Sequence, residues 1–324
     1  MKIQAIAVHA TGGPEVLRLE ERELADPGPG QLRVRTGACG VNFIDVYFRT
    51  GLYPRPLPFV AGLEGAGVVE TVGPGVVGLA AGDRVAWASA PGSYAERVVA
   101  SADALVKIPS GLSEEVAAAA MLQGMTAHYL THGVRATRPG DVALVHAAAG
   151  GTGLLLVQML KRAGARVIGT CSSAEKETLA RAAGCDEVVR YRDADFAAAV
   201  RQSTGGRGAD VVYDSVGLTT WEGSLQSLRP RGLLVLFGQS SGPVPPFDLQ
   251  RLSAGGSLFV TRPSLAHYVA TRAELEDRAS VVLGSAARGE LDVRIAARFP
   301  LAEAAEAHRA LEGRGSSGKL LLLP

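Results

Sequence analysis

A glycine-rich turn between an apolar run and a helical segment constrains the fold of this chain most. The turn reads AAAGGTG (147–153), follows the apolar run 142–147 and precedes a helical segment, 151–163, that ends at Gly164. Glycines at such a turn let the backbone approach a pyrophosphate at a helix N-terminus. The sequence of this turn departs from the strict GxGxxG motif. The prediction of a dinucleotide site therefore depends on where the turn lies, between a strand and a helix. A tight turn that binds no ligand is the alternative.

Strands and helices continue to alternate after this turn. Apolar runs at 166–170, 210–213 and 233–237 predict buried strands, and the segment 174–183 predicts a helix that Gly184 stops. Strands that are apolar on both faces, with helices between them, indicate a parallel, doubly wound sheet. We therefore expect an α/β Rossmann domain in this part of the chain.

The first 100 residues and the C-terminal segment have a different sequence pattern. Turn-then-strand patterns such as DPGPGQLRVR (26–35) predict a compact, mostly antiparallel β domain. Ser113 is a candidate N-cap for a helix. The segments 271–288 and 301–311 are helical in pattern, and GKLLLLP (318–324) predicts a strand with no place in the parallel sheet. We expect this strand to return to the first domain.

The length and composition fit a soluble globular protein of about two domains. The chain has 324 residues with 47% hydrophobic and 20% charged side chains, a composition typical of globular proteins. A net charge of +1 and the lack of Lys/Arg runs argue against a nucleic-acid partner, and no apolar run approaches the ~18 residues of a membrane span. Three widely spaced cysteines and no signal-peptide pattern favour the cytoplasm.

The tip of the strand after the turn selects between the two nicotinamide dinucleotides. An NAD site usually has an Asp or Glu about 20 residues beyond the first glycines, where it binds the ribose 2′-hydroxyl. Residues 170–173 contain no acid, whereas Ser172, Ser173 and Lys176 offer hydroxyls and a positive charge. These groups would bind a 2′-phosphate, so the sequence predicts NADPH. The alternative for Lys176 is an ordinary solvated lysine.

The chain as a whole resembles the zinc-free medium-chain dehydrogenases/reductases, close to quinone oxidoreductase and zeta-crystallin. The likeness runs nearly end to end and rests on the motifs GVNFIDVYFRTGLYP (40–54), GLEGAGVVETVG (62–73), AGDRVAW (81–87), LQGMTAHYL (122–130), HAAAGGTG (146–153), VVYDSVG (211–217), FGQSSG (237–242) and VTRPSL (260–265). It implies a GroES-like domain (1–123 with 265–324), a Rossmann domain (124–264) and an active site in the cleft between them. It also implies a homodimer formed through an edge strand at GSLFVT (256–261).

The resemblance also implies a role for each matching residue. It places four residues around the nicotinamide and the substrate and gives them the catalytic role: Asn42, Tyr47, Tyr53 and Thr126. Asn42 and Thr126 are also expected to contact the cofactor. Those it places on the rest of NADPH are Gly150, Gly151 and Thr152 at the pyrophosphate; Ser172, Lys176, Tyr191 and Arg314 at the 2′-phosphate; and Ser215, Phe237 and Gln239 towards the ribose and nicotinamide. A bacterial relative has Gly at position 172 and Asn at position 239. Asp45 and Glu64 are expected to be structural acids.

The ligands of a catalytic zinc are not present in the sequence. Zinc alcohol dehydrogenases of the same superfamily use the His of a GHE motif, and here GLE places Leu63 at that position. Leucine cannot bind a metal, and Cys39 is then most simply a small buried residue. A substrate that accepts hydride without a Lewis acid is a quinone or an activated enone. Tyr hydroxyls and the Asn42 amide would stabilise the developing oxyanion, and Tyr53 or water would supply the proton.

Two other functions remain open at this point. The first is reduction of an enone or a 2-enoyl thioester, because enoyl reductases of the superfamily share the loop with a Tyr at the place of Tyr53. The second, of another class, is an RNA-binding zeta-crystallin-like protein, which the near-neutral charge disfavours.

Overall fold

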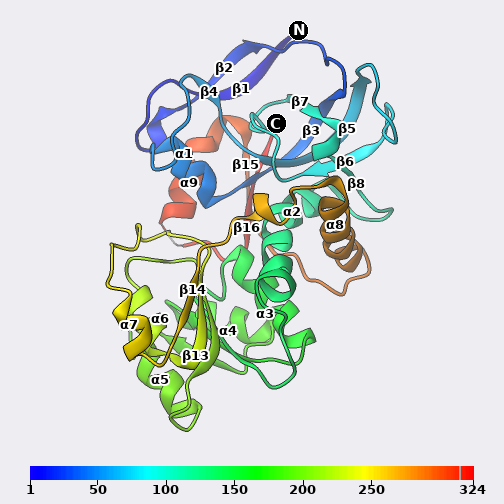
Figure 1. Cartoon of the computed structure of the whole chain (residues 1–324). Coiled ribbons are helices and arrows are strands. Elements are labelled where there is room, and N and C mark those ends of the chain that lie inside the picture. The colour runs from blue at the N-terminus through cyan, green and yellow to red at the C-terminus, as the bar shows by residue number, and fades with distance from the viewer. Residues whose placement is uncertain (314) are drawn as a thin grey trace. The chain divides into compact units, whose positions relative to one another are not determined.

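The computed structural model describes residues 1–313 and 315–324 and divides into two compact units (Figure 1). The first unit is Met1–Met125 together with Val269–Pro324, and the second is Thr126–Tyr268. The second unit is an insertion in the sequence of the first, so the first is built from two distant stretches of chain.

The second unit contains the parallel, doubly wound sheet that the sequence predicts. Its six strands run in the order β11-β10-β9-β12-β13-β14, and every neighbouring pair is parallel. The chain order reverses at β9, which has β10 on one side and β12 on the other; ligands of such sheets bind at this switch point. The strands are β9 Val142–Val145, β10 Arg166–Cys171, β11 Glu187–Arg190, β12 Ala209–Asp214, β13 Leu228–Leu236 and β14 Phe259–Thr261.

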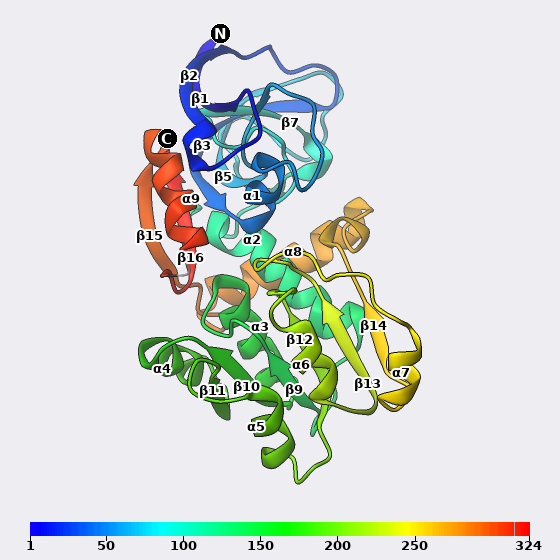
Figure 2. The same ribbon diagram turned by 90° about the vertical axis from the view of Figure 1, so that its left-hand side faces the viewer.

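Helices connect these strands (Figure 2). The first, α3, places Leu154, Leu155 and Leu156 among its buried residues, and Gly164 follows it with a φ of +83°, a conformation that favours glycine. The helices of the unit are α3 Gly151–Arg162, α4 Ala174–Ala182, α5 Phe196–Ser203, α6 Trp221–Gln226 and α7 Gln250–Ala254, with a 3-10 turn at Leu265–His267. The sequence patterns predicted neither β11 nor the helices α5 and α7.

The first unit is built mainly from antiparallel strands, as the sequence predicts. One sheet has the order β2-β1-β4; the other follows the path β15-β16-β3-β5-β6-β8, with β7 also paired to β3. Only β15 and β16 are parallel neighbours in this unit among the described strands. The strands are β1 Lys2–Val8, β2 Leu17–Glu23, β3 Gln31–Val41, β4 Phe59–Val60, β5 Glu64–Val72, β6 Arg84–Trp87, β7 Arg97–Ser101, β8 Val106–Lys107, β15 Ile295–Pro300 and β16 Lys319–Leu323.

The C-terminal strand returns to the first unit, as expected from the sequence. In β16, Leu320 pairs with Val41 and Leu322 with Cys39, both on β3. Helix α9 packs beside β15 and β16 (Figure 1). The helices are α1 Phe43–Arg49, α2 Glu114–His128, α8 Arg272–Ala287 and α9 Ala304–Glu312, with 3-10 turns at Pro14–Val16, Ala102–Ala104 and Leu301–Glu303.

The long helix α2 begins where the sequence predicts. The hydroxyl oxygen of Ser113 accepts the Val116 N–H at 3.2 Å, so Ser113 acts as its N-cap. The boundary between the two units falls inside α2, and a π-helical turn at Tyr129–Val134 follows it. The predicted helix 301–311 instead starts as a 3-10 turn and becomes α-helical at Ala304. No helix in the described part of the chain has the length and apolar character needed to span a bilayer.

Candidate functional site

The glycine turn of the second unit has a helix N-terminus that no side chain caps. Gly150 is the N-cap of α3, its carbonyl oxygen accepts the Leu154 N–H at 2.9 Å, and the first turn contains no acid. A Cβ on Gly153 would lie 2.3 Å from the carbonyl oxygen of Ala147, so only glycine allows this close packing of helix against turn. Gly151 and Thr152 open the helix between them. The backbone N–H groups and the helix dipole at this end suit a pyrophosphate.

Three of the four predicted 2′-phosphate residues, Ser172, Lys176 and Tyr191, lie just beyond the neighbouring ends of β10 and β11. Cys171 and Arg190 are register partners, and the Tyr191 N–H donates to the Cys171 carbonyl at 3.1 Å. Ser172 therefore follows one strand end and Tyr191 the other. The Ser173 hydroxyl oxygen accepts the Lys176 N–H at 3.4 Å and caps α4. Three of the four residues thus share one edge of the sheet, and the fourth, Arg314, lies outside the described residues.

The loops after β12 and β13 pack closely together. The Ser240 N–H donates to the Ser215 carbonyl at 3.2 Å, and a Cβ on Gly238 would lie 2.6 Å from that same oxygen. Phe237 donates its N–H to the Asp214 carbonyl at 2.9 Å. The structure therefore brings together the three residues predicted for the ribose and nicotinamide side, Ser215, Phe237 and Gln239. Thr126 is buried on α2, at the first position of the second unit.

In the first unit, Asn42 is held on both sides of its amide. Its Nδ2 donates to Glu64 Oε2 at 2.7 Å and to the Gly40 carbonyl at 3.2 Å, and its Oδ1 accepts from Lys319 Nζ at 2.7 Å. Lys319 also forms an ion pair with Glu64, whose other oxygen accepts the Leu122 N–H at 2.6 Å. Because both amide hydrogens donate within the protein, this arrangement leaves none for a substrate oxyanion.

The two predicted tyrosines are brought together by α1 and the loop that follows it. The rings of Tyr47 and Tyr53 meet edge to face with centroids 5.2 Å apart, and the Tyr53 N–H donates to the Tyr47 carbonyl at 3.0 Å. Phe48 contacts Tyr53 in a similar edge-on geometry at 5.9 Å. The aromatic contacts fix the two rings relative to each other.

A buried hydrogen-bonded chain runs from α1 to α9. The Tyr94 hydroxyl donates to Asp45 Oδ2 at 2.9 Å and lies 3.3 Å from His308 Nε2, while Arg49 donates to His308 Nδ1 at 3.3 Å. Nη1 and Nη2 of the Arg49 guanidinium also donate to the Glu312 carboxylate, at 2.8 Å each. Asp45 Oδ2 accepts the Asn42 N–H at 2.9 Å, so the chain ends at the predicted site loop.

Burial determines the protonation states of Asp45 and His308 in this hydrogen-bonded chain. It raises the pKa of Asp45 to about 7, although hydrogen bonds from Tyr94 and the Asn42 N–H oppose the shift. Asp45 Oδ1 is buried with no hydrogen-bond partner, which is consistent with this weak acidity. Burial and the nearby Arg49 charge lower the pKa of His308 to about 3, so this imidazole stays neutral. Asp45 is thus a buried acid with hydrogen bonds to Tyr94 and to the Asn42 backbone, as expected for a structural role.

Sequence reasoning missed Lys319, Tyr94 and His308. The one local signal was a lysine at the start of the apolar strand KLLLL, because a lysine there needs a buried partner. Nothing in the sequence near Tyr94 or His308 marks either residue as part of a network.

Cys39 is fully buried in the core of the first unit. Burial raises the pKa of Cys39 to about 12, and its Sγ donates to the Ser93 carbonyl at 2.9 Å, so it remains a thiol. A metal would need the thiolate. Among the residues that the structure describes, no group of three or more His, Cys, Asp or Glu side chains has a metal-binding arrangement.

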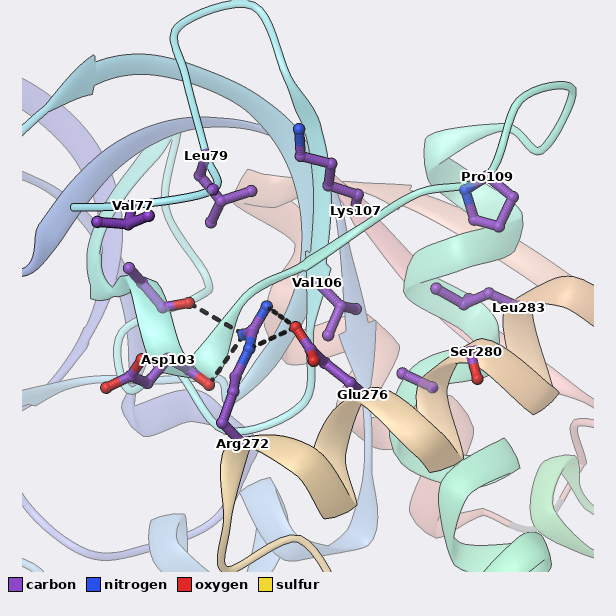
Figure 3. Close-up of a pocket in the computed structure, with 13 residues that line it drawn as sticks. Val77, Leu79, Asp103, Val106, Lys107, Pro109, Arg272, Glu276, Ser280 and Leu283 are labelled. Carbon is purple, nitrogen blue, oxygen red and sulfur yellow. Dashed lines mark hydrogen bonds and ion pairs between the residues drawn. The ribbon is translucent and has the colours of Figure 1, made fainter.

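A cavity of about 580 Å³ lies elsewhere in the first unit, beside α8 (Figure 3). Arg272 reaches across it, forms an ion pair with Glu276 at 2.7 Å and donates to the carbonyls of Ala102 and Asp103 at 3.1 Å each. These contacts fasten α8 to the 3-10 turn Ala102–Ala104. No residue predicted for the site lines this cavity.

Comparison with known proteins places this geometry in a family. The alcohol dehydrogenase GroES-like domain model matches residues 28–110, and the zinc-binding dehydrogenase model matches residues 151–274. The chain is 48% identical to a quinone oxidoreductase of Pseudomonas aeruginosa, over 97% of this chain and 98% of that protein. It is 44% identical to a 2-haloacrylate reductase of a Burkholderia species, over 99% of each chain.

Two solved structures are similar over the whole chain. The quinone oxidoreductase of Escherichia coli, complexed with NADPH, superposes with a TM-score of 0.97 at 44% identity and covers 99% of this chain and 100% of its own. A mycobacterial protein complexed with NADPH has a TM-score of 0.96 at 49% identity, with the same coverage. The chain described here therefore belongs to the quinone oxidoreductase family of the medium-chain dehydrogenases/reductases.

Proposed function

We propose that this protein is an NADPH-dependent quinone oxidoreductase that needs no metal ion. The observation that carries this conclusion is the similarity, at 44–48% identity over almost the whole chain, to proteins named quinone oxidoreductase, one of them solved with NADPH. The glycine turn and the acid-free tip of β10 suit that cofactor.

Different residues of the chain bind different parts of NADPH, which supplies the hydride when bound. The N–H groups of Gly151 and Thr152 at the start of α3 bind the pyrophosphate, and the two glycines Gly150 and Gly151 keep the backbone there accessible. Ser172, Lys176 and Tyr191, joined by Arg314, bind the 2′-phosphate. Ser215, Phe237 and Gln239 border the ribose and nicotinamide, with Thr126.

The substrate end of the site is in the first unit. The hydroxyls of Tyr47 and Tyr53 stabilise the developing oxyanion, and Tyr53 or a water supplies the proton. The Asn42 amide is hydrogen-bonded to Glu64 and Lys319, so Asn42 shapes the site and does not donate to the oxyanion. Leu63, which stands where the zinc enzymes have histidine, leaves the substrate carbonyl without a Lewis acid, and quinones are the carbonyl compounds that need one least.

We assign residues 1–123 with 265–324 to the GroES-like domain and 124–264 to the nucleotide-binding domain. We also propose a cytoplasmic homodimer that joins two sheets through β14. This strand lies at the edge of its sheet, and the Phe259 side chain on it is 60% exposed. An edge strand with an exposed aromatic side chain favours pairing with a second copy of the sheet.

Steady-state oxidation of NADPH tests the function. We expect turnover with 1,4-benzoquinone and 9,10-phenanthrenequinone, and little with crotonyl-CoA or 2-chloroacrylate. Replacement of Tyr53 by Phe removes only a hydroxyl, so kcat should fall about tenfold or more while the Kd for NADPH stays unchanged. Turnover of the thioester or the haloacrylate alone would contradict the assignment to quinones.

A further inference from the structure

A second buried polar chain links three strand ends of the nucleotide-binding sheet. His146 is 1% exposed; its Nδ1 lies 2.9 Å from the Thr170 hydroxyl and its Nε2 lies 3.0 Å from the Ser224 hydroxyl. Ser224 in turn lies 2.8 Å from Asp214 Oδ2, and Asp214 is fully buried. The four side chains therefore form one continuous path.

The hydrogens along this path have only one consistent arrangement when His146 is neutral. Asp214 as a carboxylate only accepts, so the Ser224 hydroxyl donates to it. The Ser224 oxygen then accepts from His146 Nε2–H, which leaves Nδ1 as an acceptor for the Thr170 hydroxyl. Burial lowers the pKa of His146 and keeps it in this neutral form. Every donor is directed towards Asp214.

Asp214 collects further donors from the loop after β12. Its Oδ1 accepts the N–H groups of Val216 at 2.8 Å and Gly217 at 3.0 Å, and the Thr220 hydroxyl donates to its Oδ2 at 2.7 Å. The carboxylate thus fixes the backbone on the far side of Ser215, which is one of the residues assigned to the ribose.

The other members of the path stand beside the remaining cofactor segments. His146 follows β9 and precedes the glycine turn; Thr170 lies on β10, two positions before Ser172. The three strands β10, β9 and β12 are adjacent (Figure 2). Ala147, next to His146, has a φ of +50°, in the left-handed region that a residue with a Cβ adopts at a cost. The turn is therefore held in a conformation that needs support from its surroundings.

We propose that His146, with Thr170 and Ser224, is a positioning residue for NADPH. Through Asp214 it sets the glycine turn, the tip of β10 and the loop 215–217 in register with one another before the cofactor arrives. This inference rests on the proposed function, since it concerns how that cofactor site is preorganised. Because none of the residues in the path is assigned to the 2′-phosphate, we expect it to act on NADPH and NADH alike.

Replacement of Thr170 gives the sharpest test, because Val and Ser separate its shape from its hydroxyl. Thr170→Val keeps the shape and removes the donor to His146; Thr170→Ser keeps the donor. We expect Thr170→Val and Ser224→Ala to raise the Kd for both NADPH and NADH about tenfold, and Thr170→Ser to stay within about twofold of the wild type. The control Val200→Ala lowers stability in the hydrophobic core of the same unit but removes no hydrogen-bonding group of this path, and it should leave both Kd values unchanged.

Hydrogen exchange in the ligand-free protein supplies a readout without the cofactor. Thr170→Val and Ser224→Ala should speed exchange of the amides in 146–153 and 214–220, whereas Val200→Ala should not do so selectively. If the Kd and exchange of Thr170→Val follow those of Val200→Ala at equal loss of stability, the path is only structural and the inference is wrong. If the wild type itself fails to bind NADPH, the proposed function fails instead.

Discussion

Lys319 and Glu64 form an ion pair in which the side chains are only 1% and 0% exposed. Each lies in a different strand, β16 and β5, and both also bond the amide of Asn42. A buried charge without its partner is strongly destabilising, whereas the intact pair contributes little net stability over apolar residues. This pair therefore matters mainly for holding Asn42 in one orientation.

Removal of the lysine alone should be costly. Lys319→Met leaves the Glu64 carboxylate buried and uncompensated, and we expect the free energy of unfolding to fall by about 3–5 kcal/mol. Combining it with Glu64→Gln removes the orphaned charge and should recover much of that loss. Urea denaturation of the two variants measures the difference. A double variant no more stable than Lys319→Met would show that charge burial is not the cause.

Asp45 should make the protein less stable as the pH rises. Its pKa is about 7 in the folded protein and 3.8 ordinarily, so between about pH 4 and pH 7 the folded state holds a proton that the unfolded chain has lost. The stability advantage of wild type over Asp45→Asn should shrink by about 2 kcal/mol between pH 5 and pH 7. Urea unfolding at both pH values measures it, and equal differences would argue against the raised pKa.

His308 should have the opposite effect on acid stability. Its pKa is about 3 in the folded protein and 6.5 ordinarily, so between these values the unfolded chain binds a proton that the folded state does not. Stability conferred by the neutral imidazole is present above pH 6.5 and lost as the pH falls. Relative to His308→Gln, the wild type should lose about 2 kcal/mol between pH 6.5 and pH 5. Parallel pH curves for the two proteins would contradict this.

The parts of the fold that the sequence predicted are those with a local pattern. The glycine turn, the strands on either side of it and the Ser113 cap depend on residues a few positions apart. β11 was missed because EVVR is short and only partly buried, and thus lacks a long apolar run. The Lys319–Glu64 pair and the His308–Tyr94 contact join residues more than 200 positions apart, which no local pattern reveals.

The same distinction applies to the site. Residues on the glycine turn and the β10 tip were predicted from spacing, and they follow β9 and β10, which are parallel neighbours in the sheet. The role first given to the Asn42 amide, that of a free donor, depended on its neighbours, and the structure shows these neighbours already accept both hydrogens.

Lys176 should control the choice of nicotinamide dinucleotide. Lys176→Ala removes a charge at the predicted 2′-phosphate position, so the Kd for NADPH should rise about tenfold or more while the Kd for NADH stays constant. Fluorescence titration with each cofactor measures both. Lys161→Ala is a matched control on the adjacent helix, where the lysine pairs with Asp186. Equal affinity of the wild type for NADPH and NADH would refute the phosphate site.

Ala147→Gly should stabilise the protein. A left-handed conformation costs a residue with a Cβ about 1–2 kcal/mol, and the greater freedom of glycine in the unfolded chain offsets about 0.5–1 kcal/mol of the gain. Since Ala147 is exposed, its Cβ contributes little packing, and the free energy of unfolding should rise by roughly 0.5–1 kcal/mol. Ala148→Gly, at a buried position, should lower it. Both are measured by urea denaturation, and a loss at position 147 would contradict the argument.

The pairing of β16 with β3 affects how the protein is made on the ribosome. The sheet of the first unit cannot be completed until translation has passed Leu323, although most of its strands emerge before the nucleotide-binding unit does. Until then Glu64 has no Lys319 to neutralise it, and an edge of β3 stays open. The nucleotide-binding unit is continuous in sequence and can fold before the first unit is complete, so the nascent first unit is the part that exposes an unpaired strand edge for longer.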